Sequence, residues 1–300
     1  MKKKTYLFAL MAMGLTLGSC SDNENGIGGE TSKYITVSTS IGNMTRVATD
    51  AKGGQTFEEG DEISVYAWTG APTVAPETSE RVVNNAINKL TNGTWVSTPQ
   101  MLWKNNREKH YFIGVYPTAA ISDLSAGEYT FDVNKQTESD LLVAVNPDGL
   151  SYSADAQQTV PLTFTHVMAK LAVNLTYKNQ WGGIPTVEKV VVGNAAKEAT
   201  INYLTKVVTP STTAKEDFSL PEITENTKYV SVIIPQEDVK QLTIVIDGKN
   251  FAYDNGTPFK LESGKITTVN LEVGRDEIKL GDVKITDWED GSTFGGEALN

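Results

Sequence analysis

The chain of 300 residues contains one cysteine, two histidines and no cluster of basic residues after Lys2–Lys4. A single cysteine excludes an internal disulfide, so the fold must be stabilised by packing alone. The formal net charge is −11, and an acidic chain without a basic patch is repelled by phosphates, so we expect no nucleic-acid partner. For the same reason the polypeptide has no polybasic contact to offer to anionic lipid.

Residues that carry chemistry are equally scarce. His110 and His166 do not have the His-x₃-His or Cys/His spacing of a zinc site. We expect both to have structural roles, which for His166 means packing or a hydrogen bond at a domain interface. The sequence has no Gly-x-Ser-x-Gly elbow, Walker loop or dinucleotide-binding glycine pattern. These absences predict a protein that is not an enzyme, with no catalytic residue, no metal and no cofactor.

Acidic clusters and tryptophans leave alternatives open. Glu58–Glu62 and Asp287–Asp290 suggest a glycosidase pair or a calcium loop. A glycosidase needs two carboxyls across a cleft, and neither cluster has EF-hand spacing, so solvated turns are the favoured interpretation. The five tryptophans have the chemistry to stack on sugars, although tryptophans on strands more often belong to the core.

The N-terminus has the pattern of a secretory signal. Lys2–Lys4 precede an apolar run from Tyr6 to Leu17, which is too short to span a membrane because a spanning helix needs about 20 residues. Gly18-Ser19 then lead directly into Cys20, an arrangement that resembles the lipobox of bacterial lipoproteins. We therefore predict a signal peptide over residues 1–19 and a lipidated Cys20, followed by a flexible polar tether over residues 20–33.

Most of the chain after residue 30 has the two-residue period of β-strands. Ile35, Val37, Thr39 and Ile41 alternate with polar residues, which predicts a half-buried strand. Further strands are predicted at 63–68, 111–116, 141–145, 169–177, 230–234, 242–246, 251–253, 259–261 and 269–273. Asn-Gly or Asp-Gly pairs at 92–93, 247–248 and 255–256 predict tight hairpins. Helical spacing occurs between Ser79 and Leu90, where we expect a short helix at most.

Short strands with frequent turns indicate β-sandwiches, and the ordered part of the chain is too long for one small sandwich. The polar stretch from Ser151 to Gln158 is the best candidate for a break between two of them. The prediction is an all-β protein with an N-terminal β-sandwich over residues 34–158 and a C-terminal β-sandwich over residues 159–300.

Four segments together resemble the fimbrillin-like proteins of Bacteroidetes, the family of type V pilus subunits. The segments are Phe57–Tyr66, similar to "F..GD.I.VY"; Asp140–Ala144, similar to "DLLxA"; Val160–Leu171, similar to "V.L.F.H.MAKL"; and Ile285–Gly291, similar to "I..W..G". The resemblance runs from about residue 34 to residue 298. It implies two transthyretin-like β-sandwich domains in tandem and a structural role in a cell-surface fimbria that serves adhesion.

The resemblance also implies a way of assembly. Lipidated precursors of that family reach the outer membrane, an arginine-directed protease removes an N-terminal strand, and a strand from another pilin subunit takes its place. Arg46 stands where that cleavage is expected, with an ordinary loop arginine as the alternative, and Ile278–Phe294 is the candidate donor. The alternative function is a glycan-binding surface lipoprotein without polymerisation, which exposed tryptophans on one face would favour. A hydrolase would need a cleft with convergent carboxylates.

The lipid anchor makes a direct prediction. Replacing Cys20 by Ala should release the protein from membranes, because the polypeptide has no other segment suited to hold it there. Membrane fractionation with labelled fatty acid measures this, and Ser21→Ala is the matched control that should stay bound and labelled. A Cys20→Ala chain that remained membrane-bound and labelled would contradict the prediction.

Overall fold

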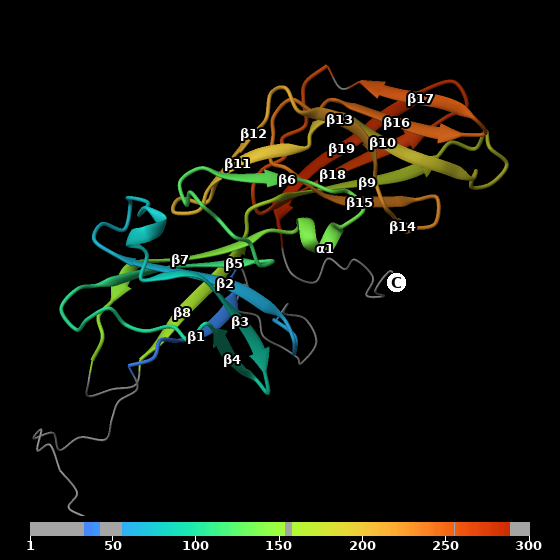
Figure 1. Cartoon of the computed structure of the whole chain (residues 1–300). Helices are drawn as coiled ribbons and strands as arrows, with labels where there is room; N and C mark the ends of the chain where they lie inside the picture. The colour runs from blue at the N-terminus through green and yellow to red at the C-terminus, as the bar shows by residue number, and fades with distance from the viewer. Residues whose placement is uncertain (1–32, 43–55, 154–157, 255, 289–300) are drawn as a thin grey trace, which may run out of the picture.

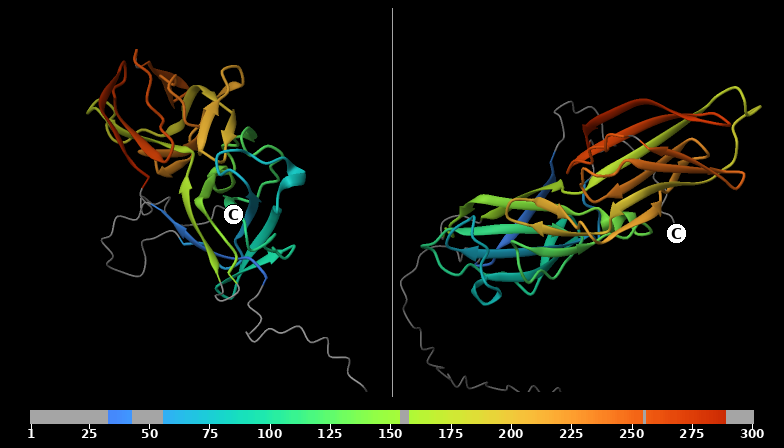
Figure 2. Two further views of the ribbon diagram at one scale, coloured as in Figure 1. Left: turned by 90° about the vertical axis from the view of Figure 1, so that its left-hand side faces the viewer. Right: turned by 90° about the horizontal axis from the view of Figure 1, so that it is seen from above.

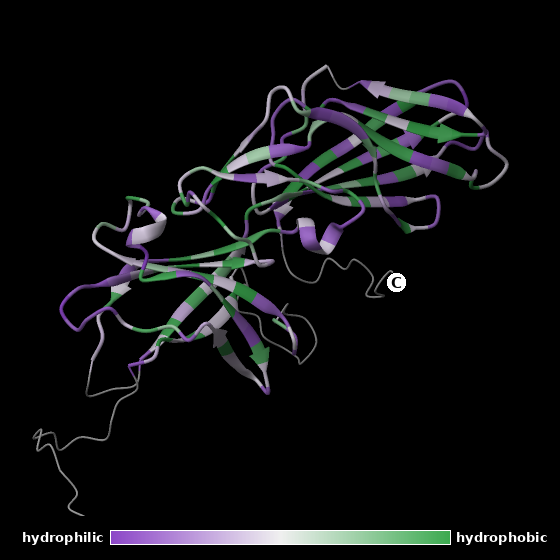
Figure 3. Ribbon diagram, viewed as in Figure 1, coloured by the Kyte–Doolittle hydropathy of each residue, from purple (hydrophilic) through white to green (hydrophobic). Residues whose placement is uncertain are grey.

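The computed structural model describes residues 33–42, 56–153, 158–254 and 256–288, and it is all-β as predicted. The molecule is elongated and has two parts, which follow one another along its length (Figures 1 and 2). Hydrophobic residues gather in the strands, whereas the hairpin ends and connections are mostly hydrophilic (Figure 3). The described residues contain no helix that is long and apolar enough to cross a membrane.

The first part is a seven-stranded sheet in the order β1-β8-β7-β5-β2-β3-β4. Its strands are β1 (Thr36–Ile41), β2 (Glu62–Thr69), β3 (Val83–Thr91), β4 (Thr94–Thr98), β5 (His110–Tyr116), β7 (Leu142–Leu150) and β8 (Thr159–His166). All neighbours are antiparallel except β1 and β8, which are parallel. β8 starts directly after the predicted boundary at residue 158 and pairs with strands from before it; the division of the chain into two domains stays a prediction.

This sheet curls until its two edges approach each other. The backbone N–H of Ile35, just before β1, donates to the carbonyl of Met101, just after β4, over 3.0 Å. The N–H of Trp103 donates to the carbonyl of Lys33 over 3.2 Å. The enclosed core takes buried side chains from all seven strands, among them Val37, Val65, Ala86, Trp95, Phe112, Ala144 and Phe164. We call the line where β1 meets β4 and residues 99–103 the seam.

The second part consists of two facing sheets. One has the order β14-β15-β9-β18-β19, and the other has the order β13-β10-β16-β17. Their strands are β9 (Ala169–Tyr177), β10 (Val187–Ala196), β13 (Lys215–Ser219), β14 (Glu222–Thr224), β15 (Lys228–Ile233), β16 (Gln241–Ile246), β17 (Lys249–Asp254), β18 (Lys265–Val273) and β19 (Ile278–Asp287). β9 and β18 are parallel, and the other pairs are antiparallel.

A small sheet and a shared core connect the two parts. β6 (Gly127–Thr130) pairs with β11 (Glu198–Asn202), which pairs with β12 (Val207–Pro210). The outer face of β2, β5 and β7 belongs to the same apolar cluster as the interior of the second part. The Lys206 ammonium donates to Thr165 Oγ1 over 3.0 Å. Burial lowers the pKa of Lys206. The two parts therefore share a buried interface.

The predicted turns and the predicted helix had different outcomes. Asn92-Gly93 and Asp247-Gly248 have positive φ at both positions and close hairpins, as expected. The expected helix near 79–90 is wrong, because only a 3₁₀ turn, η1 (Thr78–Glu80), precedes β3. Asn85 has φ +55° beside a register shift in the β2–β3 pairing. That bulge puts Val83 and Ala86 on one face, so the strand has a helix-like spacing. The second helical element, α1 (Gln136–Ser139), was not predicted.

The curled core predicts a cost for any side chain at Gly114 in β5. A Cβ there would lie 2.6 Å from Phe164 Cζ, so Gly114→Ala should lower the free energy of unfolding by about 1–3 kcal/mol through overpacking. Gly256→Ala, where a Cβ meets nothing within 4 Å, is the control. Urea unfolding measures both, and equal midpoints for the two variants would contradict this packing.

Candidate functional site on the first and last strands

β1 is the edge strand whose removal would open the seven-stranded sheet. Its inward side chains, Val37 and the adjacent Ile35, are buried in the core. Its outward hydroxyls form contacts with β8 instead: Thr36 with Thr159, and Ser40 with Thr163, each over 3.2 Å. Along Thr36–Ile41 the backbone of β1 pairs in register with β8 alone. β1 is thus held by one ladder and two deeply buried side chains.

The third inward position of β1 carries a polar bond across the seam. Thr39 Oγ1 accepts a hydrogen bond from Trp95 Nε1 over 3.0 Å, and Trp95 is only 9% exposed. The Phe57 ring packs edge-on against Trp95, Tyr116 and Phe164, with centroids 5.1–5.4 Å apart. Thr39 therefore provides the acceptor for the indole N–H of a largely buried tryptophan that packs against Phe57.

β19 is the corresponding edge strand of the second part. It pairs with β18, and a register shift opposite Val269–Leu271 inserts one extra residue at Gly281-Asp282. This bulge keeps Ile278, Leu280, Val283 and Ile285 opposite β18 partners that lie mostly in the core. Val283 and Ile285 are nevertheless 39% exposed. β19 thus presents an apolar stripe that its own domain covers incompletely.

The end of β19 is fixed at the junction of the two parts. Trp288 is 2% exposed, and its backbone N–H donates to Gly264 over 3.0 Å. Its indole stacks on His166, with centroids 4.1 Å apart, and the Lys170 ammonium lies 4.1 Å above it. His166 Nδ1 contacts Asp140 Oδ1 over 2.8 Å. His166 has the interface role expected for it, and the pin by Trp288 was not predicted.

The sequence profile of the fimbrillin-like proteins matches residues 45–288. The chain belongs to the fimbrillin-like family. No curated protein matches it.

Solved structures share the fold of this fimbrillin-like chain. A proposed cell adhesion protein of Bacteroides ovatus is 18% identical with a TM-score of 0.62, over 85% of this chain and 98% of that one. A second, from Bacteroides uniformis, is 19% identical with a TM-score of 0.60, over 78% and 93%. A fimbrial protein of Bacteroides vulgatus is 13% identical with a TM-score of 0.53, over 86% and 100%. At these identities the likeness concerns the fold alone.

Two sequence-predicted site residues, Cys20 and Arg46, lie outside the described residues. The described strand β1 ends at Ile41 and β2 begins at Glu62, so Arg46 belongs to the connection between them. After β1, the backbone N–H of Gly42 still donates to Phe164 over 2.7 Å. The segment with Arg46 therefore follows directly from the strand that fills the seam.

The acidic clusters form turn contacts. Asp61 accepts from the N–H of Glu58 over 2.7 Å, Glu59 accepts from the N–H of Asn92 over 2.6 Å, and Glu62 pairs with Lys89 over 3.0 Å. Asp287 pairs with Lys265. Within residues 33–42, 56–153, 158–254 and 256–288, no three His, Cys, Asp or Glu side chains are grouped for a metal ion. Glu58, Glu59 and Asp61 thus have the turn contacts that the sequence suggests, whereas Glu62 and Asp287 lie in β2 and β19 and form ion pairs with the neighbouring strands.

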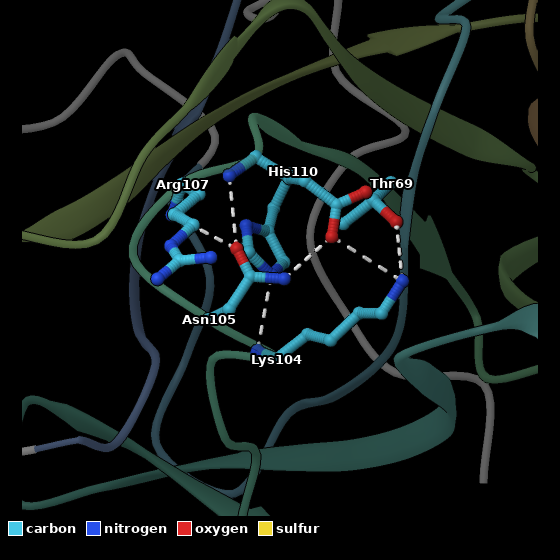
Figure 4. A network of polar contacts seen from close by, with 6 residues as sticks. Thr69, Lys104, Asn105, Arg107 and His110 are labelled. Atoms are coloured by element: carbon cyan, nitrogen blue, oxygen red, sulfur yellow. Dashed lines mark hydrogen bonds and ion pairs between the residues drawn. The ribbon is translucent and has the colours of Figure 1, made fainter.

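His110 lies in a polar network that closes the connection between β4 and β5 (Figure 4). Its Nε2 accepts the backbone N–H of Lys104 over 3.0 Å, and burial lowers its pKa. Asn105 Oδ1 accepts the N–H groups of Arg107 and Glu108, each over 2.9 Å. Lys104 reaches Thr69 over 3.0 Å. Every one of these contacts holds the loop to itself or to β2, which is a structural role.

The tryptophans do not form an exposed platform. Trp68, Trp95 and Trp288 are buried. Trp103 and Trp181 are half-buried, with Trp103 against His110 and Phe112, and with the Trp181 indole donating to Val273 over 3.0 Å. Exposed tryptophans on one face would have favoured the glycan-binding hypothesis, so the burial of these side chains favours the pilin hypothesis.

The seam bond predicts an unequal effect of similar substitutions. Thr39→Val leaves the Trp95 indole without its acceptor and should lower the free energy of unfolding by about 1–2 kcal/mol. Thr39→Ser keeps the hydroxyl and should retain most of that stability. Thr36→Val, on the outer face, is the matched control and should change stability by about 0.5 kcal/mol or less. Thermal or urea unfolding checks the series, and a harmless Thr39→Val would contradict the role of the bond.

Proposed function

We propose that this fimbrillin-like chain is a structural subunit of a cell-surface fimbria that serves adhesion. In this proposal Cys20 carries the lipid that anchors the precursor in the outer membrane. Cleavage after Arg46 by an arginine-directed protease then frees β1, and a strand from another pilin subunit replaces it. The proposal includes two tandem transthyretin-like sandwiches, divided at residues 158 and 159, and no enzymatic activity.

The observation that carries the proposal is the position of β1 in a chain of this family. β1 lies at the edge of the sheet, parallel to β8, and the connection that contains Arg46 begins immediately after it. Loss of β1 would leave the β8 edge unpaired and uncover a groove beside Trp95, Met101 and Phe164. Each buried aliphatic side chain contributes about 1.5–3 kcal/mol, and an open sheet edge is a template for another strand.

The last strand supports the same proposal from the other side. β19 is an edge strand of extended backbone whose apolar stripe, Ile278, Leu280, Val283 and Ile285, is only partly covered. A strand whose apolar side chains are only partly buried in its own chain loses little burial when it leaves. A groove in a second copy that covers these side chains more fully would favour its transfer. The candidate donor Ile278–Phe294 begins with this strand, and its residues after Trp288 lie outside the described ones.

Cleavage should convert the monomer into a polymerising subunit. Limited treatment with trypsin should give a new N-terminus at Val47 and ladders on non-denaturing gels that grow with protein concentration, because the open groove is stabilised by a strand from another copy. N-terminal sequencing and gel analysis measure the two steps. Deleting residues 278–300 should abolish the ladders and leave the cleaved chain soluble.

Two arginine variants make this test specific. Trypsin would also cut after Lys52, so both variants are treated with an arginine-specific protease. Arg46→Ala should then remain uncleaved between β1 and β2 and should stay monomeric. Arg107→Ala, at an exposed loop arginine before β5, should be cleaved and should assemble as the parent does. A cleaved chain that stays monomeric at high concentration, or an Arg46→Ala chain that assembles normally, would overturn the proposed function.

A further inference from the structure

The last strand contains a five-residue repeat. Ile278-Lys279-Leu280-Gly281-Asp282 is followed directly by Val283-Lys284-Ile285-Thr286-Asp287. Both units, which we call the pentads, have an aliphatic residue, a lysine, an aliphatic residue, a small residue and an aspartate in that order. Because side chains alternate across a strand, the two aliphatic residues and the aspartate of one pentad lie on the same face of an extended chain.

The segment that occupies the seam has the same order. Ile35-Thr36-Val37-Ser38-Thr39 puts Ile35 and Val37 into the core, and Thr39 then accepts the hydrogen bond of Trp95. The second and fourth positions, Thr36 and Ser38, lie on the outer side towards Thr159 and Pro161 of β8. Each pentad therefore matches this segment at all five positions. The first and third residues are apolar and point inward, and the fifth residue, also inward, is a hydrogen-bond acceptor. The second and fourth residues are polar or small and point outward.

We propose that Trp95 selects the incoming strand by favouring a pentad that places a hydrogen-bond acceptor, here the side chain of an aspartate, where Thr39 stands. This inference rests on the proposed function, and its partner is β19 of a second copy of the chain. Without an acceptor at that position the indole N–H of Trp95, a residue that is only 9% exposed, would lose its protein partner, and an unpaired donor at a largely buried site costs more than a hydrogen bond contributes. The Trp95 indole thus sets both the register and the direction of the strand that replaces β1.

The direction follows from the order of the residues. In β1 the acceptor comes after the two aliphatic residues, and β1 runs parallel to β8. In both pentads the aspartate also comes last, so a donor that runs parallel to β8 places all three inward groups correctly. A reversed strand would bring its aspartate to the place of Ile35, which is buried in the apolar core, and burial of an unpaired carboxylate there is strongly unfavourable.

A carboxylate at the place of Thr39 is physically acceptable. Thr39 is half-buried rather than enclosed, so one carboxylate oxygen keeps access to water while the other accepts from the indole. Hydrogen bonds to ionised acceptors are stronger than neutral ones. In β19 both aspartates are exposed; Asp282 accepts from Asn270 over 2.7 Å and Asp287 pairs with Lys265. Exposed contacts of this kind are weak, so release of β19 gives up little at these two aspartates.

The test measures binding of labelled peptides to the chain cleaved at Arg46. The parent peptide spans residues 278–287, and an unlabelled peptide of residues 33–42 should compete with it for the groove. A peptide with Asp282→Ala and Asp287→Ala should bind about tenfold or more weakly than the parent, because the indole is left unpaired. A peptide with Asp282→Asn and Asp287→Asn keeps a carbonyl acceptor and should bind close to the parent. Peptides with a single Asp→Ala change identify which pentad is seated.

The Trp95→Phe chain supplies the second arm. Without the indole N–H it should bind the parent, Asn and Ala peptides alike. The inference is overturned if no peptide binds, if the Asn and Ala peptides bind equally to the parent chain, or if Trp95→Phe still discriminates between them. Ladder formation is scored separately. Peptide discrimination without ladders would refute the proposed function alone, and ladders without discrimination would refute the selection by Trp95 alone.

Discussion

The parallel pairing of β1 with β8 is the contact on which the first part of the molecule depends. The two strands lie far apart in the chain, yet their alignment closes the curled sheet and covers the core beside Trp95, Met101 and Phe164. On its other side, β1 is held by the hydrogen bond between Thr39 and Trp95. Just before β1, residues 33–35 form backbone hydrogen bonds with residues 101–103. In the proposed assembly, this sheet is stable while β1 is tethered, and it offers a binding groove once β1 has left.

The second part depends on its connection to the first. β6 and β11 form one ladder across the junction, and the outer face of β2, β5 and β7 shares its apolar cluster with the facing sheets. Trp288 lies at this junction, stacked on His166, which contacts Asp140. The end of the last strand is therefore attached where the two parts meet, whereas the middle of the strand is only partly covered. Release of the whole of β19 would therefore also cost the Trp288 contacts.

The sequence predicted the local structure better than the contacts between distant segments. Alternation located β1 and β9 closely, because both have apolar residues at every second position, and the Asn-Gly and Asp-Gly turns predicted two hairpins. Alternation gave the wrong structure near Asn85, where a bulge adds one residue to the strand. The buried residues there are three positions apart, which is the spacing of a helix. The place of β8 in the first sheet and the two parallel pairs depend on distant partners that periodicity does not specify. Thr39 was visible as a polar residue on an apolar face, but its partner Trp95 is 56 positions away.

Tethering explains how similar strands can coexist without exchange in the proposed assembly. While β1 is joined to β2 by the covalent chain, its effective concentration at the seam exceeds that of a free strand in solution. A β19 strand from another copy has to compete with that value while giving up its own contacts, including those of Trp288. Cleavage between β1 and β2 removes the advantage of the tether and leaves the intrinsic fit to decide. The pentads then have two aliphatic side chains and a charged acceptor for Trp95, whereas β1 has two aliphatic side chains and a neutral hydroxyl. The charged acceptor forms the stronger bond, so in the proposed assembly cleavage turns a monomer stabilised by its tether into a chain that gains by exchanging strands.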